Sequence, residues 1–138
     1  MSYTAKQARE VSGLPQGTFS QWLQRGLARP SVPGKGHGGR SEWTSGAIIA
    51  IVLTQYLGED IELTKAADIA HNMLDFISKY DAVREDELYP VSINLRTYEW
   101  GDPDLMIKSM GSDKLLTISL GKIINNALTK INEVDDEY

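Results

Sequence analysis

Apolar residues recur with helical spacing over the first quarter of the 138-residue chain. A first helix is predicted over residues 4–11, with the Thr4 hydroxyl as its cap. Residues 12–15, Ser-Gly-Leu-Pro, end this helix, because glycine admits left-handed backbone geometry and proline cannot continue a helix. A second helix is predicted over residues 16–26, and its apolar face carries Phe19, Trp22 and Leu23. We expect Phe19 and Leu23 in the core and Trp22 there with an exposed indole edge.

A glycine-rich stretch follows the second helix. No packed element can be built from residues 33–39, so the sequence predicts a loop flanked by short extended pieces. A flexible backbone of this kind can follow a phosphate chain, and its cations supply attraction. A solvated loop whose charges only keep the protein soluble would have the same composition. The cationic or titratable side chains of this stretch are Lys35, His37 and Arg40.

Two further helices are predicted before residue 81. The first begins after Thr44 and ends at residues 58–60. It is apolar on nearly all sides, so neighbouring elements must cover it. The second spans residues 64–80 with one apolar stripe, beside which His71 is interpreted as structural. Residues 81–87 are rich in charge and form the predicted hinge between two units.

Beyond the hinge the apolar period changes from 3.6 to 2, which indicates strands. Strands are predicted over residues 89–95, 105–110 and 114–119. Residues 100–104 read as a turn, and Gly111-Ser112-Asp113 as a hairpin turn between the last two strands. A final helix is predicted from about Leu120.

These elements place the chain in the α+β class. Residues 1–80 are predicted to form a helical domain, and residues 88–138 a small β-β-β-α domain for dimerisation or regulation. Three strands and one helix give a thin core, so a second copy is expected to cover the exposed face of the sheet or helix. Packing against residues 61–80 of the same chain is the alternative.

Charge is distributed unevenly along the sequence. The whole chain has a net charge of −5. Residues 1–45 hold six basic and two acidic side chains, a net of +4, whereas residues 46–138 hold eight basic and seventeen acidic ones, a net of −9. A basic module on an acidic body indicates an anionic partner for the front of the chain only.

The composition argues against several classes of protein. Without cysteine there are no disulfides, thiolate metal sites or cysteine nucleophile, and two histidines make a histidine-rich metal site unexpected. No apolar run has the ~18 residues of a membrane span, and the first residues resemble no secretory signal. No nucleophile–base pair or phosphate-binding glycine loop is present. We therefore expect a cytoplasmic protein that is not an enzyme and has no metal, cofactor or membrane partner; whether a small-molecule effector exists stays open.

The order helix, turn, helix, glycine-rich wing and third helix resembles the MerR-type winged helix-turn-helix. The residues that carry this resemblance are Trp22, Gly26-Leu27, Pro30, Gly39-Arg40 and Trp43-Thr44, within residues 3–57. The chain departs from the family at Ser20, where many members have an arginine that meets the DNA backbone. The helix at residues 64–80 is also too short for the family's coiled-coil dimer. The resemblance therefore implies DNA binding but not the family's effector sensing.

Side chains off the apolar face of the second helix are the candidates for reading DNA. Residues near the start of a recognition helix usually contact bases, and Gln can pair bidentately with adenine. Arg25 suits a phosphate or the helix dipole, and the wing cations suit a phosphate or the minor groove. A solvated polar face is the alternative for each. The predicted DNA-binding residues are Gln16, Gly17, Thr18, Ser20, Gln21, Trp22, Arg25, Lys35, His37 and Arg40.

The sequence thus predicts sequence-specific binding of double-stranded DNA by a small bacterial or phage protein. We expect a transcriptional regulator that acts as a homodimer, with helix 16–25 in the major groove and wing 33–41 on the backbone or minor groove. A DNA-packaging or excisionase-type phage protein is the alternative, since excisionases and small terminase subunits resemble this chain at their N-termini. An adaptor whose helix-turn-helix docks on a protein is the third.

Overall fold

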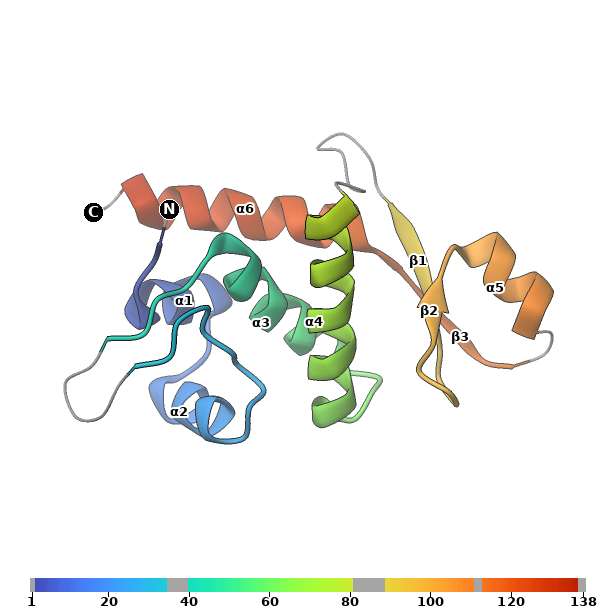
Figure 1. Ribbon diagram of the computed structural model, residues 1–138, viewed down its shortest axis with the longest axis horizontal. Helices are drawn as coiled ribbons and strands as arrows, with labels where there is room; N and C mark the ends of the chain where they lie inside the picture. The colour runs from blue at the N-terminus through green and yellow to red at the C-terminus, as the bar shows by residue number, and fades with distance from the viewer. Residues whose placement is uncertain (1, 35–39, 81–88, 111–112, 137–138) are drawn as a thin grey trace.

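The computed structural model describes residues 2–34, 40–80, 89–110 and 113–136, and it belongs to the α+β class (Figure 1). Four helices come first, then a small sheet with one inserted helix, and a long helix last. The bounds are α1 Ala5–Ser12, α2 Gln16–Gln24, α3 Ser45–Leu57, α4 Leu63–Tyr80, β1 Pro90–Asn94, β2 Trp100–Gly101, α5 Pro103–Met110, β3 Leu115–Ser119 and α6 Leu120–Asp136. The predicted hinge at residues 81–87 lies outside the described residues.

The first two helices begin and end within about two residues of their predicted positions. The Thr4 hydroxyl accepts a hydrogen bond from the backbone N–H of Gln7, and the Gln7 side chain accepts one from the Thr4 N–H. This reciprocal pair satisfies two amides that a helix start otherwise leaves unpaired. Gly13 and Gly26 both have φ of 73°, the left-handed geometry in which glycine commonly ends a helix.

The sheet contains three antiparallel strands in the order β2-β1-β3, so β1 is central. Three strands were predicted, but the second one was placed wrongly. Residues 105–110 lie in helix α5, and the second strand is Trp100–Gly101, which was read as part of a turn. The predicted hairpin between the last two strands is therefore wrong, and the order of elements is β-β-α-β-α.

A helix cap explains why residues 105–110 are helical. The Asp102 carboxylate accepts hydrogen bonds from the backbone N–H groups of Asp104 and Leu105, at 3.0 and 3.2 Å. Pro103 occupies the first helical position, where its missing N–H costs nothing. Within α5 only Met106 is buried among the side chains described, whereas Leu105 and Ile107 are exposed, so its apolar residues do not all gather on one buried face.

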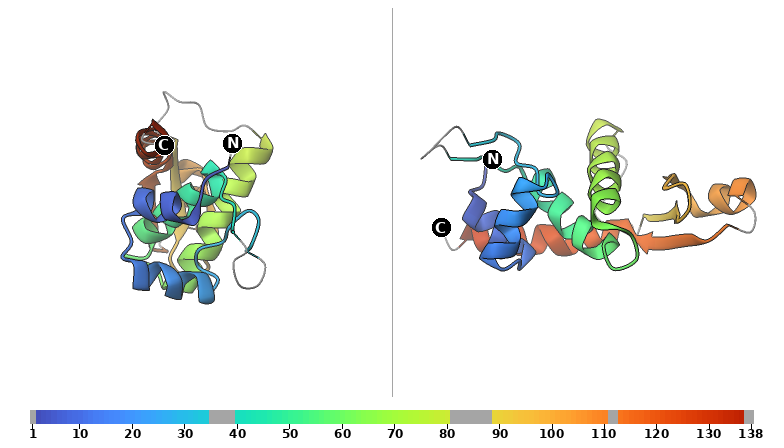
Figure 2. Two further views of the ribbon diagram at one scale, coloured as in Figure 1. Left: turned by 90° about the vertical axis from the view of Figure 1, so that its left-hand side faces the viewer. Right: turned by 90° about the horizontal axis from the view of Figure 1, so that it is seen from below.

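The sheet lies between α4 and α5 (Figures 1 and 2). On one face, the Trp100 ring meets Phe76 of α4 edge-on at 5.5 Å, and its indole N–H donates to the Asn72 side chain at 2.8 Å. On the other face, Met106 of α5 lies against Gly101, where an added Cβ would stand 3.6 Å from its sulfur. Both faces of β1 are buried as a result.

Helix α6 runs back across the N-terminal helices and packs on α1 and α3 (Figure 1). Its buried residues join one hydrophobic cluster with α1, α3 and α4, so the apolar helix α3 is covered by α1, α4 and α6. The apolar face of α6 is thus covered within the same chain. A second copy or residues 61–80 were expected from the sequence to cover this face.

This packing predicts that the two ends of the sequence unfold together. Ile131 of α6 is 1% exposed, and Ile131→Ala should lower the free energy of unfolding by about 2–5 kcal/mol through the lost contacts and the cavity. Hydrogen exchange of the α1 and α3 amides should become faster along with that of α6. Thr129→Ala, at an exposed position of the same helix, is the control. Unchanged exchange in α1 and α3 would instead indicate an independent C-terminal domain.

Candidate nucleic-acid interface

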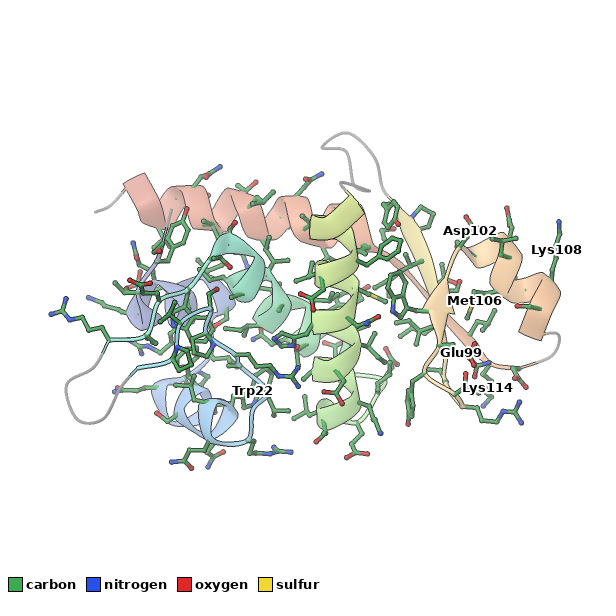
Figure 3. All side chains as sticks on the ribbon, in the orientation of Figure 1. Trp22, Glu99, Asp102, Met106, Lys108 and Lys114 are labelled. Atoms are coloured by element: carbon green, nitrogen blue, oxygen red, sulfur yellow. The ribbon has the colours of Figure 1, made fainter. Side chains whose placement is uncertain are left out.

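Helix α2 presents a mainly polar face to solvent, and none of its own residues, Gln16–Gln24, is charged. Phe19 and Trp22 are 5% and 7% exposed and face the core, so the opposite side of the helix is free (Figures 1 and 3). Five of the predicted residues are exposed and share this side, and Thr18 is half-buried at its margin. The exposed ones are Gln16, Gly17, Ser20, Gln21 and Arg25.

Two exposed residues of this face were not predicted from the sequence. Gln24 is one turn beyond Ser20 and two turns beyond Gln16, so it belongs to the same row, and this period was visible in the sequence. Leu23 was predicted to be core but is 37% exposed. Trp22 and Phe19 already fill the space between α2 and the core, so Leu23 is left at the rim of the exposed face. The surface formed by residues 16, 17, 20, 21, 23, 24 and 25 is called the α2 face below.

A tilted pair of aromatic rings in contact connects α2 to the base of the wing. The ring of Phe19 lies 5.7 Å from that of Trp43, tilted by 43°, and Trp43 is fully buried. The Trp43 indole N–H donates to the Ser41 hydroxyl at 3.0 Å. A buried indole with its N–H satisfied is fixed in orientation. The position of α2 relative to the wing is therefore determined by core packing.

Backbone pairing builds the base of the wing from three short extended segments. Tyr3 and Trp43 exchange two backbone hydrogen bonds at 2.7 and 3.0 Å, and Val32 and Glu42 exchange two at 3.1 and 2.8 Å. The Ser31 hydroxyl also accepts a hydrogen bond from the N–H of Thr44, the cap residue of α3. The predicted extended pieces are confirmed. Arg40 is exposed above this base, whereas Lys35 and His37 lie outside the described residues.

The start of α2 is open to a ligand. Its N-cap is Pro15, whose side chain has no hydrogen-bond acceptor, and the first amide with a helical partner is that of Phe19. The N–H groups of residues 16–18 therefore have no intrahelical acceptor, and such groups favour anions. At Gly17 a Cβ would meet nothing within 4 Å, so packing inside the protein does not require glycine there.

Arg29, one of the cations in the basic N-terminal part of the chain, forms an ion pair within the protein. The Arg29 side chain donates to the Gly26 carbonyl at 2.7 Å and to the Asp68 carboxylate of α4 at 2.7 Å. Both members of this ion pair are about half exposed, so it contributes little to stability, but it directs Arg29 away from the α2 face. Arg25 within the α2 face and Arg40 in the wing are both exposed cations.

His71 has a structural position on α4, as interpreted from the sequence. Its Nδ1 lies 2.7 Å from the Ala67 carbonyl, and in the described part of the chain no group hydrogen-bonds its buried Nε2. Burial lowers the pKa of His71 below its usual 6.5, and the charge of Arg29 lowers it further. The Ala67 hydrogen bond and the carboxylates of Asp75 and Asp68 act in the opposite direction but do not prevail.

Within the described residues, no three acidic or histidine side chains gather in a way that could hold a metal ion. No helix in that part of the chain has the length and apolar character needed to cross a membrane. Searches of protein-family models and of curated protein sequences find no significant match to this chain.

The lowered pKa of His71 predicts a pH-dependent stability. The unfolded chain binds a proton at His71 more readily than the folded chain does, so the free energy of unfolding should fall as the pH drops through about 6.5. The slope from this one group cannot exceed about 1.4 kcal/mol per pH unit. Urea unfolding from pH 7.5 to 5.5 should show this loss in the wild type and a smaller one in His71→Gln. Equal slopes would contradict the assignment.

Proposed function

We propose that the protein binds double-stranded DNA in a sequence-specific way and acts as a transcriptional regulator. The α2 face enters the major groove, and the wing that starts at residues 31–32 and returns at residues 40–43 lies on the backbone or minor groove. The proposed role is that of a MerR-like binding protein in the cytoplasm and not that of an enzyme.

The observation that carries the proposal is the chemistry of the α2 face. Its amide and hydroxyl side chains, Gln16, Ser20, Gln21 and Gln24, can donate and accept hydrogen bonds, which is what reading base edges requires. Few charges lie among them, so this face is better suited to selecting a sequence than to binding any polyanion. The Phe19–Trp43 contact holds the face beside the wing.

The open start of α2 supports the same docking mode. A duplex phosphate at residues 16–18 would accept hydrogen bonds from the unpaired amides, and the absence of a side chain at Gly17 lets the sugar-phosphate chain come close. Arg25 at the other end of α2 and Arg40 in the wing supply two further exposed cations. Contacts of this kind fix the register of a protein on DNA, and base contacts then give selectivity.

The direct test is selection from a random duplex library, followed by affinity measurements across a salt series. We expect a two-fold symmetric site with half-sites about 34 Å apart or a multiple of it. With Arg25, Lys35 and Arg40 each neutralising one phosphate per protomer, log K should fall with log salt with a slope of roughly −5 for a dimer. No retained duplex even at low salt would overturn the proposal and leave a protein-docking adaptor.

Single substitutions separate base reading from phosphate contact. Gln21→Ala should relax selectivity at one base pair by about 1–3 kcal/mol and leave the salt slope unchanged. Arg40→Ala should weaken binding to all sequences alike and make the slope shallower by about 1 per protomer. Asn126→Ala and Lys130→Ala, at exposed positions of α6, are the matched controls and should change neither quantity. The same losses in the controls would contradict the assigned interface.

Gly17→Ala tests close approach at the start of α2. A Cβ at this position meets open space, and alanine favours helix more than glycine, so stability should stay the same or rise by up to about 1 kcal/mol. DNA affinity should nevertheless fall, because the methyl group stands between the backbone and the phosphate. Thermal unfolding and a binding isotherm measure the two effects. Unchanged affinity would remove the start of α2 from the interface.

The packaging or excision alternative differs in how copies of the protein assemble on DNA. A ring-like oligomer, or cooperative filling along a duplex without a symmetric site, would favour it over regulation. Sedimentation of the protein–duplex complex at increasing protein concentration distinguishes these cases from a dimer on one operator.

A further inference from the structure

Strand β3 forms one edge of the sheet. It pairs with β1 on one side, and in the described part of the chain no strand pairs with its other side (Figure 2). Its sequence, Leu-Leu-Thr-Ile-Ser, contains no charge and no proline. Natural proteins usually protect an edge strand of this length with lysine, proline or a bulge. β3 has none of these between Leu115 and Ser119.

The hydrogen-bond pattern shows which residues of β3 point outward. The Leu95 N–H donates to the Lys114 carbonyl, and the Leu120 N–H donates to the Tyr89 carbonyl. In an antiparallel ladder the bonded pairs alternate, so residues 116 and 118 also bond inward to β1. The backbone N–H and C=O groups of Leu115, Thr117 and Ser119 therefore point away from β1, toward the free edge.

This edge is complementary to itself. If two copies of β3 run antiparallel about a two-fold axis at Thr117, residue 117 bonds to 117 of the second copy, and 115 bonds to 119 in both directions. All outward N–H and C=O groups of these three residues are then paired. On one face of the joined sheet, Leu116 stands opposite Ile118 of the other copy, which continues the apolar row of Ile93 and Val91.

We propose that β3 joins β3 of a second copy of this chain to form a two-fold symmetric dimer with a six-stranded sheet. The two α5 helices then lie on the same face of this sheet. Each covers β1, and three strand spacings separate the two β1 strands, so the helices are about 14 Å apart. Leu105 and Ile107, 65% and 58% exposed, lie on opposite sides of α5 about the buried Met106, so one of the two faces the other copy. A non-identical peptide could use the same edge, but only a second copy uses its symmetry.

The dimer would serve DNA binding, because two α2 faces related by a two-fold axis match a palindromic site. This role of the dimer rests on the proposed DNA-binding function. The chain then needs no coiled coil. The interface is formed by the sheet, whereas the α2 face lies at the opposite end of the molecule (Figures 1 and 3). Dimerisation and DNA binding are therefore expected to be separable by mutation.

A charge-swap experiment at Thr117 tests the interface. Thr117 is exposed, and the axis places it directly opposite its own copy, so like charges there repel and opposite charges attract. The wild type should sediment as a dimer at micromolar concentration. Thr117→Lys and Thr117→Glu should each raise the dimer dissociation constant roughly tenfold or more. An equimolar mixture of the two variants should restore the dimer.

Two further variants control for folding and for side-chain loss. Thr117→Val removes the hydrogen bond of 2.6 Å between the Ser92 and Thr117 hydroxyls but keeps the outward N–H, so it should remain dimeric. Thr117→Pro removes that N–H without breaking the ladder to β1, a placement that edge strands tolerate, and should give a folded monomer. Circular dichroism melts check the fold of each variant. A monomeric wild type, or single charge variants that remain dimeric, would overturn the proposal.

DNA binding distinguishes failure of this interface from failure of the proposed function. A wild-type dimer with the charge-swap behaviour but no affinity for duplex DNA would keep the interface and end the regulator proposal. A wild-type monomer that selects a single half-site would do the reverse. If both the β3 interface and DNA binding are correct, Thr117→Lys should bind one half-site normally and lose the cooperative gain on the full palindrome.

Discussion

The packing of Phe19 against the buried Trp43 is the contact on which the arrangement of the N-terminal half depends. Trp43 lies where the wing returns to the body, paired through its backbone to Tyr3 and followed at once by the cap of α3. One side chain therefore links α2, the wing and the start of α3. The proposed reading of base edges by α2 requires a fixed orientation of this helix relative to the wing, and the Phe19–Trp43 packing provides it.

Helix α4 has the corresponding role for the C-terminal half. One side packs on α3, and another receives Trp100 from the sheet through Phe76 and Asn72. Helix α6 then packs on α1 and α3, so the last helix of the chain contacts the first. One hydrophobic cluster therefore extends from Ala8 to Ile131. The proposed interfaces, the α2 face and the edge of β3, lie at opposite ends of this common core. A substitution in one of these interfaces is thus expected to leave the structure of the other unchanged.

Much of the fold follows from local signals that the sequence displays directly. Thr4 and Thr44 mark the starts of helices, and Gly13 and Gly26 mark the ends of helices. The alternation of apolar and polar residues over 90–94 and 115–119 predicts β1 and β3.

The strand predicted at residues 105–110 was wrong because the capping signal of Asp102-Pro103 was read only as a turn. The prediction that Leu23 lies in the core was wrong, because helical spacing shows which residues share a face but not how much of that face is covered. The docking of α6 on α1 joins residues more than a hundred positions apart, and no local pattern specifies it. The polar row on α2 was found from the sequence apart from Gln24, since the same period that marks the core marks the opposite face.

Binding of duplex DNA by the α2 face and the wing can be checked by an NMR titration of the isotopically labelled protein with a selected duplex. Amide shifts are expected to concentrate on residues 16–25 and 40–42, with small changes in α5 and the sheet at protein concentrations that saturate the proposed dimer. Shifts that concentrate on α5, β2 or α6 while the α2 amides stay in place would contradict it.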